Sequence, residues 1–396
     1  MKKVIAAAAG LMLVGTMVGS ASADIVFSGD ARARALYQSN YDLGSSSVDE
    51  ETGAVTRNNE KDNLISSRFR LQARANAPGG AYAVGRLALG NGTWDGGNSG
   101  TTSASTADKA YIGVPMGMTL LEAGRTPTQG LESTKFFEHD ITRDGARLFI
   151  MPTDAATIEL SYYIDYEAAV NGDNIDDNDD SLYGLWVDLK FAGDWGTRMG
   201  VLYRDDQVLN DGRDDDGAFG GIEFMGPGGP VAISGAFAFD DQGEGDTGYG
   251  GFLMGGMQFG ATSVALTAGF AQDGFVTDGD HGFIMLGGGE SITLNTGARG
   301  RTDMRFGAQG DTWWIGVPVS FAVSEMLTVK GNLAYADMDE FGEAFEISGS
   351  VIYAISDGAS VDLDIGYLAY SQGDFDDRLD AEDSPFGAGL TFNVSF

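Results

Sequence analysis

The sequence predicts an all-β fold, a transmembrane antiparallel β-barrel of about 16 to 18 strands, and three observations support this prediction. Apolar residues recur at every second position through most of the chain after residue 23. Short turns rich in Gly, Pro and Asp alternate with long polar segments. The last residues, 390–396, alternate apolar and polar and end in Phe. Strands with short turns at one end and long loops at the other are typical of transmembrane barrels.

The composition excludes several classes of protein. The chain has 396 residues, and 24 Lys and Arg against 58 Asp and Glu give a net charge of −34. Such an acidic chain repels phosphate backbones, so no nucleic-acid partner is expected. There is no Cys, which excludes disulfides and thiolate-held metals. His139 and His281 are the only histidines and leave little room for a His-ligated metal or a catalytic triad. We therefore expect no enzyme, no cofactor and no dedicated metal site.

The N-terminal segment 1–23 has the pattern of a cleaved signal peptide. Lys2 and Lys3 precede an apolar run from Val4 to Val18, and Ala21-Ser22-Ala23 is a small-x-small cleavage site. A membrane anchor is the alternative, but the apolar run is short for a bilayer of about 30 Å. The sequence thus predicts an exported protein whose mature barrel domain covers residues 24–396.

The strands are predicted by their period of two. Alternation is clearest at 24–37, 67–76, 157–166, 181–191 and 361–367, each with one apolar and one charged face. A soluble β-sandwich would also alternate, but a chain of this length would normally divide into several domains. No linker or change of composition marks such a division. Charged inner faces also fit a wet lumen better than a packed core.

The turns and loops give the strand count. Counting hairpins gives 18 strands, with short turns on the periplasmic side and long loops outside. The weakly alternating segments 217–225 and 343–354 could reduce this number to 16. The long segment 273–311 has three open interpretations: an extracellular loop, a plug or an extra hairpin.

The terminal strand carries a first resemblance. Leu390, Phe392, Val394 and Phe396 alternate with polar residues at the end of the chain. This pattern resembles the terminal strand by which outer-membrane proteins are recognised for assembly. The resemblance implies the barrel-assembly machinery as a partner and the Gram-negative outer membrane as the location.

Arginines gather at inward positions of the first strands. A barrel of this strand number is wide enough for an aqueous channel, so these side chains would line a pore. Arg125 follows in Glu122-Ala123-Gly124-Arg125, where the face of the strand is ambiguous. The expected pore-wall arginines are Arg32, Arg34, Arg68, Arg70, Arg74, Arg86 and Arg125.

Two further segments resemble the general diffusion porins. Residues 119–127, TLLEAGRTP, look like the fifth strand of that family, and residues 144–152, DGARLFIMP, are similar to the returning sixth strand. The resemblance implies that residues 129–142 form the third loop, folded into the pore. It also implies that the loop acids Glu132, Glu138 and Asp140 form a constriction opposite the arginine wall.

The expected function follows from this resemblance. It implies an outer-membrane porin for passive diffusion of ions and small hydrophilic solutes. The net charge and the Asp-rich loops predict a mild cation preference. The alternative is a channel selective for one sugar, acid or other nutrient. Preferred solute, pore radius and gating are left open by the sequence.

Partners are predicted from the outer face and the loops. Outward positions of the first strands are small, including Ala31, Ala33, Ala73 and Ala83, which suits packing against another barrel. This agrees with the homotrimer that the resemblance implies. Lipid and lipopolysaccharide would surround the rest. The acidic runs 173–180 and 214–216 favour loosely bound Ca²⁺, with a specific Ca²⁺ site as the alternative, because they lack the spacing of an EF-hand loop.

Overall fold

The computed structural model describes residues 24–41, 46–48, 55–57, 61–93, 106–128, 130–167, 179–206, 216–241, 246–288, 292, 304–339, 341–371 and 384–396. The predicted signal peptide, residues 1–23, lies outside the described residues. So does the greater part of the acidic runs at 173–180 and 214–216, for which loose Ca²⁺ binding is expected. Within the described part of the chain, no helix has the length and hydropathy needed to cross a membrane.

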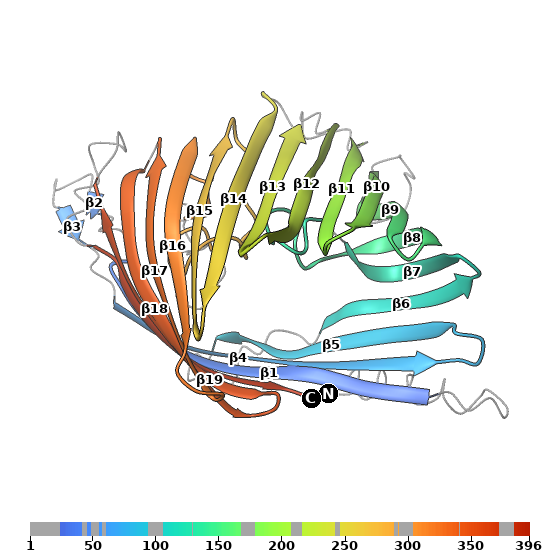
Figure 1. Ribbon diagram of the computed structural model, residues 1–396, viewed down its shortest axis with the longest axis horizontal. Helices are drawn as coiled ribbons and strands as arrows, with labels where there is room; N and C mark the ends of the chain where they lie inside the picture. The colour runs from blue at the N-terminus through green and yellow to red at the C-terminus, as the bar shows by residue number, and fades with distance from the viewer. Residues whose placement is uncertain are drawn as a thin grey trace.

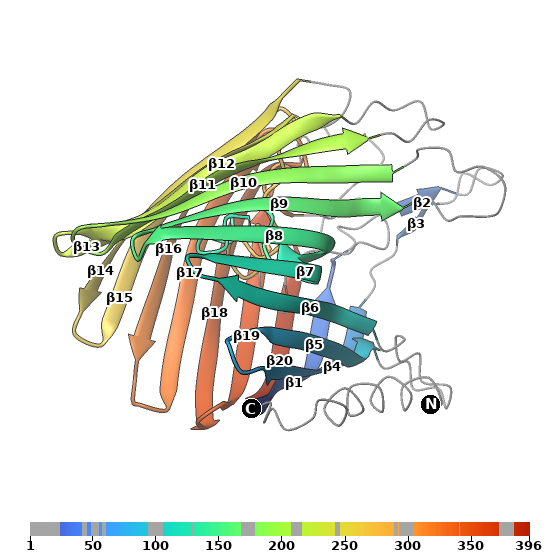
Figure 2. The same cartoon turned by 90° about the vertical axis from the view of Figure 1, so that its right-hand side faces the viewer.

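The molecule is a closed antiparallel barrel of 18 strands, which confirms the predicted fold (Figures 1 and 2). Each strand pairs with the next along the chain, and β1 closes the ring by pairing with both β4 and β20. The barrel strands are β1 (Asp24–Ser39), β4 (Lys61–Asn76), β5 (Tyr82–Thr93), β6 (Thr106–Met116), β7 (Thr119–Thr128), β8 (Ile141–Thr153), β9 (Ala156–Glu167), β10 (Asp179–Phe191), β11 (Trp195–Asp206), β12 (Gly217–Gly228), β13 (Val231–Asp241), β14 (Gly248–Phe259), β15 (Thr262–Gln272), β16 (Thr312–Ala322), β17 (Leu327–Met338), β18 (Gly342–Ser356), β19 (Ala359–Tyr370) and β20 (Phe386–Ser395).

The strand count settles at the upper predicted value. The two weakly alternating segments are complete strands, β12 and β18, and both pair along their length with their neighbours. A separate hairpin, β2 (Ser46–Val48) and β3 (Val55–Arg57), lies outside the barrel sheet.

Alternation along each strand separates an outer from an inner face. On β9, Leu160 and Tyr162 are exposed on the outside, whereas Glu159 is fully buried on the inside. On β18, Phe345 and Ile347 are exposed, whereas Glu346 between them is fully buried. Large apolar side chains therefore form the outer surface and charged side chains lie within, the reverse of a soluble protein.

The largest buried side chains lie inside the ring of strands. They come from the inner faces of the strands and from two segments between strands, 130–140 and 273–311, whose described parts run within the barrel in Figures 1 and 2. Leu131 and Phe136 of the first segment, and Phe275 and Phe306 of the second, are fully buried. The predicted infolding of the third loop is thus confirmed, and the second infolded segment is a new feature.

Candidate functional site

One wall of the lumen is rich in arginine, as the alternation predicts. Arg32 of β1 lies directly opposite Arg68 of β4 in the register, and Asp30 lies opposite Arg70. Asp30 bridges both β4 arginines, at 3.1 Å to Arg68 and 2.7 Å to Arg70. The residues that the structure places on this inner wall are Arg32, Arg34, Arg68, Arg70, Arg74 and Arg86.

Paired acids neutralise only part of this wall. Arg86 forms an ion pair with Asp108 of β6 at 2.8 Å, and the guanidinium of Arg74 stacks on the ring of Tyr82 at 3.8 Å. Arg32 has no ion pair with any residue that the structure describes, and the Nε of Arg68 is buried without a hydrogen-bond partner. Like charges facing each other across a ladder repel. The Arg32–Arg68 position is therefore suited to an anionic group.

Arg125 is an exception, and the expectation that it lines the pore is wrong. Glu122 and Thr126 of β7 are buried on the inner face, so Arg125 shares the outer face with Leu121. Its side chain is 45% exposed and forms an ion pair at 2.6 Å with the equally outward Asp144. The small residues before it give no polarity signal, so the sequence could not fix its side of the strand.

The segment 130–140 is anchored to the opposite wall. Glu223 of β12 accepts hydrogen bonds from the backbone N–H groups of Ser133, at 3.2 Å, and Thr134, at 2.9 Å. It also accepts one from the Thr134 hydroxyl at 2.8 Å. Arg198 of β11 donates to the carbonyl of Gly130 at 2.8 Å. These contacts hold the segment inside the barrel rather than above it.

The three expected constriction acids occupy different environments. Glu138 pairs with Arg143 of β8 at 2.7 Å. The carboxylate of Asp140 interacts electrostatically with the ammonium group of Lys109 on β6. Glu132 is partly exposed, and its Oε2 lies 3.7 Å from Nε2 of His139; burial raises the pKa of its carboxyl. In these described contacts, Glu138 and Asp140 thus interact with Arg143 and Lys109, and not with the arginines of the predicted wall.

The described parts of the segment 273–311 pack along the inner face of the later strands. Its described parts contain no strand, so of the three open interpretations they fit a plug-like segment best. Glu346 of β18 accepts hydrogen bonds from the backbone N–H groups of Ile284, Met285 and Leu286, at 3.1, 3.1 and 2.7 Å. The hydroxyl of Tyr41 donates to the carbonyl of Ile292 at 2.6 Å.

The two infolded segments pack against each other. Ring centroids of Phe136 and Phe275 are 5.5 Å apart, and those of Phe136 and His281 are 4.9 Å apart. Asp278 donates its backbone N–H to the carbonyl of Phe136 at 3.0 Å. Burial among these rings lowers the pKa of His281 to about 4, so its imidazole is neutral at pH 7. The segments therefore form one packed unit inside the barrel.

A chain of paired charges, most of them buried, lies in the wall beneath the first segment. Arg147 of β8 pairs with Glu122, which also accepts a hydrogen bond from the hydroxyl of Tyr82. Arg198 bridges Glu159 at 3.2 Å and Asp188 at 2.7 Å. Buried charges of this kind need such pairing, because an unpaired charge in a dry site is costly.

The anchoring role of Glu223 and Glu346 was not predicted from the sequence. Each is an isolated acid at an inward position of a strand whose other inward residues are small or apolar. That contrast was visible in the sequence. This contrast did not show that the backbone of a distant segment donates its N–H groups to each carboxylate.

Comparison with known proteins places the fold. No family model matches the sequence, and no curated protein sequence is similar to it. The outer membrane protein OprD from Pseudomonas aeruginosa has 12% identity and a TM-score of 0.57, over 95% of this chain and 95% of that chain. OccD3 (OpdP) from the same organism has 12% identity and a TM-score of 0.56, over 96% and 94%. An anion-selective porin from Comamonas acidovorans has 15% identity and a TM-score of 0.50, over 95% and 100%. The chain thus shares the barrel fold of outer-membrane porins.

Proposed function

We propose that this chain is an outer-membrane channel that selects its solutes, and that small hydrophilic anions such as carboxylates pass along its arginine wall. The observation that supports this most directly is the division of the inner face. Arginines gather on β1, β4 and β5, whereas the two infolded segments pack against β12 and β18. Solutes are thereby directed towards the arginine side.

Arginine side chains suit the recognition of carboxylates in a pore. A guanidinium stays charged at any physiological pH and offers a planar fork of donors that matches a carboxylate. Arg32 and Arg68 face each other, with an unsatisfied Nε on Arg68. A solute carboxylate at this position would relieve the repulsion between them.

Selectivity, rather than free diffusion, is supported by the interior packing. A barrel of 18 strands would be wide if it were empty. Here the aromatic and aliphatic side chains of two segments fill part of the interior. The similar fold of OprD, OccD3 and the anion-selective porin supports a channel in the outer membrane.

A general diffusion channel with a mild cation preference is the second candidate. The observation in its favour is the net charge of −34, much of it in polar stretches between strands. Acidic residues at the mouths of a pore attract cations, so their charge counteracts the preference of the arginine wall for anions. Either channel would be exported by the signal peptide and inserted through the terminal strand 390–396. It would lie among lipopolysaccharide as a homotrimer, and neither function involves catalysis.

The test is conductance of the purified protein in a planar bilayer under a tenfold KCl gradient. We expect a reversal potential that favours chloride, and saturable block of the current by small carboxylates but not by neutral sugars. Arg32→Gln combined with Arg68→Gln should weaken the carboxylate block at least about tenfold, because a paired guanidinium contact contributes roughly 1.5–3 kcal/mol.

Arg125→Gln is the control, because it removes a guanidinium by the same substitution from the outer face. It should leave both block and reversal potential unchanged. A wild-type channel that prefers potassium and passes carboxylates and sugars alike would contradict the proposal and favour general diffusion.

A further inference from the structure

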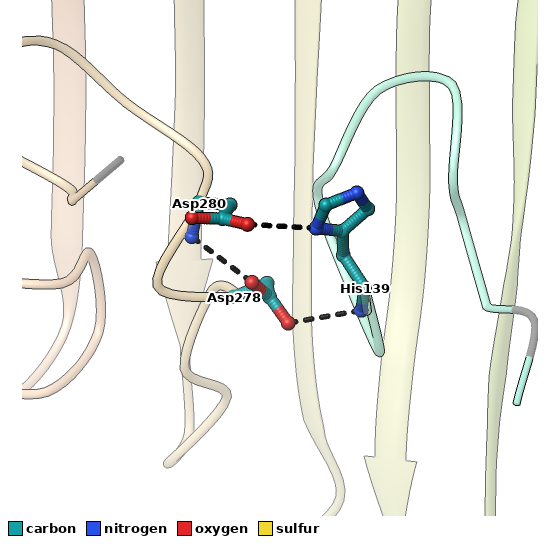
Figure 3. Close-up of side chains that lie close together, drawn as sticks. All are labelled: His139, Asp278 and Asp280. Carbon is teal, nitrogen blue, oxygen red and sulfur yellow. Dashed lines mark hydrogen bonds and ion pairs between the residues drawn. The ribbon is translucent and has the colours of Figure 1, made fainter. Parts of the chain in front are cut away.

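His139 lies where the two infolded segments meet, with a carboxylate at each ring nitrogen. Its Nδ1 is 2.9 Å from Oδ2 of Asp280, and its Nε2 is 3.7 Å from Oε2 of Glu132. Asp278 completes the group by accepting the backbone N–H of His139 at 2.9 Å. Figure 3 shows Asp280 facing the imidazole across the gap between the segments, with Asp278 beside them.

This arrangement is unbalanced for a neutral imidazole. A neutral ring has one N–H donor and one lone pair, so it can donate to only one of the two carboxylates. The lone pair of the other nitrogen then points at a negative charge. A cation bound to one nitrogen would remove this conflict, and the other nitrogen would remain free to donate.

The local charge also calls for a cation. Asp278, Asp280 and Glu132 converge on His139, and none of the described ion pairs gives Asp278 or Asp280 a lysine or arginine partner. The ligand atoms of His139, Asp278 and Asp280 all lie within 4.8 Å of one another. The side chain of Asp280 is 45% exposed, so an ion can reach the group from solvent.

The two aspartates are held ready to act as ligands. One oxygen of Asp278 accepts the backbone N–H of Asp280 at 2.9 Å, and the other accepts that of His139 at 2.9 Å. These bonds fix the carboxylate, and each oxygen keeps a second lone pair. Two ligands of a tetrahedral zinc ion lie about 3.3 Å apart. The observed 2.9 Å between Nδ1 and Asp280 is close to that separation.

We propose that His139, Asp278 and Asp280 bind a divalent transition-metal ion of the zinc type, and that this ion joins the two infolded segments. Nδ1 of His139 and one oxygen of each aspartate are the ligands, and water completes the coordination. Nε2–H then faces Glu132, whose Oε2 lies 3.7 Å away and would have to move closer to accept it, as outer carboxylates accept from metal-bound imidazoles. A mixed nitrogen and oxygen set suits zinc better than magnesium or calcium. The sequence predicted no metal site because it showed only two histidines; the fold brings distant carboxylates to one of them.

The test is calorimetric titration of the metal-stripped, full-length protein in detergent with Zn²⁺, and separately with Mg²⁺. We expect one saturable zinc site per chain that Mg²⁺ does not occupy. His139→Gln and Asp280→Asn should each weaken zinc binding at least about tenfold. Asp194→Asn, in the exposed β10–β11 turn, removes one carboxylate elsewhere and should leave zinc binding unchanged.

Heat-modifiable electrophoretic mobility shows that each variant is folded, so lost binding is not lost structure. Absence of a saturable zinc site overturns the proposal, as does equal zinc binding in wild type, His139→Gln and Asp280→Asn. Equal binding of Zn²⁺ and Mg²⁺ also overturns it, because this would indicate general attraction to acidic loops. The titration does not depend on ion flow, so it stands apart from the proposed channel function.

Discussion

Glu346 shows how one side chain holds a whole segment in place. Its carboxylate is fully buried on the inner face of β18 and receives three backbone N–H groups from residues 284–286. Hydrogen bonds to a charged acceptor contribute about 1.5–3 kcal/mol each. No cation of the described residues pairs with Glu346, so the N–H groups themselves compensate its charge.

Glu346→Gln should therefore release residues 284–286 from the wall. An amide is neutral and has a single acceptor oxygen, so it cannot hold three donors as a carboxylate does. We expect protease cleavage within 273–311 to become at least about tenfold faster while the barrel stays folded, since lost bonds of about 1.5 kcal/mol or more shift the opening equilibrium by that factor. Limited proteolysis with mass spectrometry measures this.

Glu325→Gln, in the exposed turn between β16 and β17, is the matched control and should cleave like wild type. Equal cleavage in Glu346→Gln and wild type would mean that aromatic packing alone holds the segment.

The face of the strand on which a side chain lies was predictable wherever polar and apolar residues alternate. Arg68, Arg70 and Arg74 alternate with Phe69, Leu71 and Ala73, which places the arginines inside. Arg125 follows Ala123 and Gly124, which have no polar contrast, so its side could not be read. The neighbours of Glu346 and His139 were not predictable, because they lie about 60 and 140 residues away along the chain.

At the scale of elements, closure of the barrel depends on the pairing of β1 with β20. Gly29 and Phe396 exchange two backbone hydrogen bonds, at 2.8 and 3.0 Å. A Cβ built on Gly29 would lie 2.5 Å from the carbonyl oxygen of Arg70 and 2.6 Å from the ring of Phe396. The ring of Phe396 also packs near Phe69, with centroids 6.1 Å apart. Because Gly29 has no side chain, the ring of Phe396 can pack over it.

Gly29→Ala should weaken this closure. The backbone oxygen cannot move away without distorting the ladder, and overpacking of this kind costs about 1–3 kcal/mol. We expect the temperature at which the folded electrophoretic band is lost to fall by several degrees. Gly255→Ala is the control, because its new methyl group would meet only Val231, at 3.6 Å. An equal fall in both variants would mean that strand glycines matter for backbone reasons alone.

Strands were predictable from the sequence, but the inner segments were not. Period-two alternation marked the barrel strands, because each strand has one lipid face and one lumen face. Residues 273–311 have no period, and the structure of their described parts is determined by contacts with strands such as β14, β16 and β18. Hence their burial could not be read from local pattern.

At the scale of the molecule, the outer surface is uneven. Small residues such as Ala31, Ala33 and Ala73 face outward among larger ones on β1 and β4, whereas large ones such as Leu253 and Phe345 face outward on later strands. A shallow groove of about 310 Å³ lies over the small side, lined by residues including Ala31, Ala33, Phe69 and Phe392. A surface of this shape suits packing against a second barrel better than contact with lipid.

Ala33→Trp should therefore reduce the proportion of trimer. An indole at this position would fill the groove and hold a neighbouring barrel away. Native mass spectrometry in detergent measures the change, and we expect trimer in wild type and mainly monomer in Ala33→Trp. Leu253→Trp, on the opposite outer side, should remain trimeric. A monomeric wild type would refute the predicted assembly.

The pairing of β1 with β20 also sets the order of events during assembly. All other neighbours in the ring are consecutive barrel strands, so each can pair as soon as its hairpin has formed. The first strand alone must wait for the last, and until then it presents an open edge of unpaired backbone groups. Such an edge invites pairing with other chains. We therefore expect the unfinished ring to need a temporary partner strand, which the terminal strand replaces when it pairs with β1.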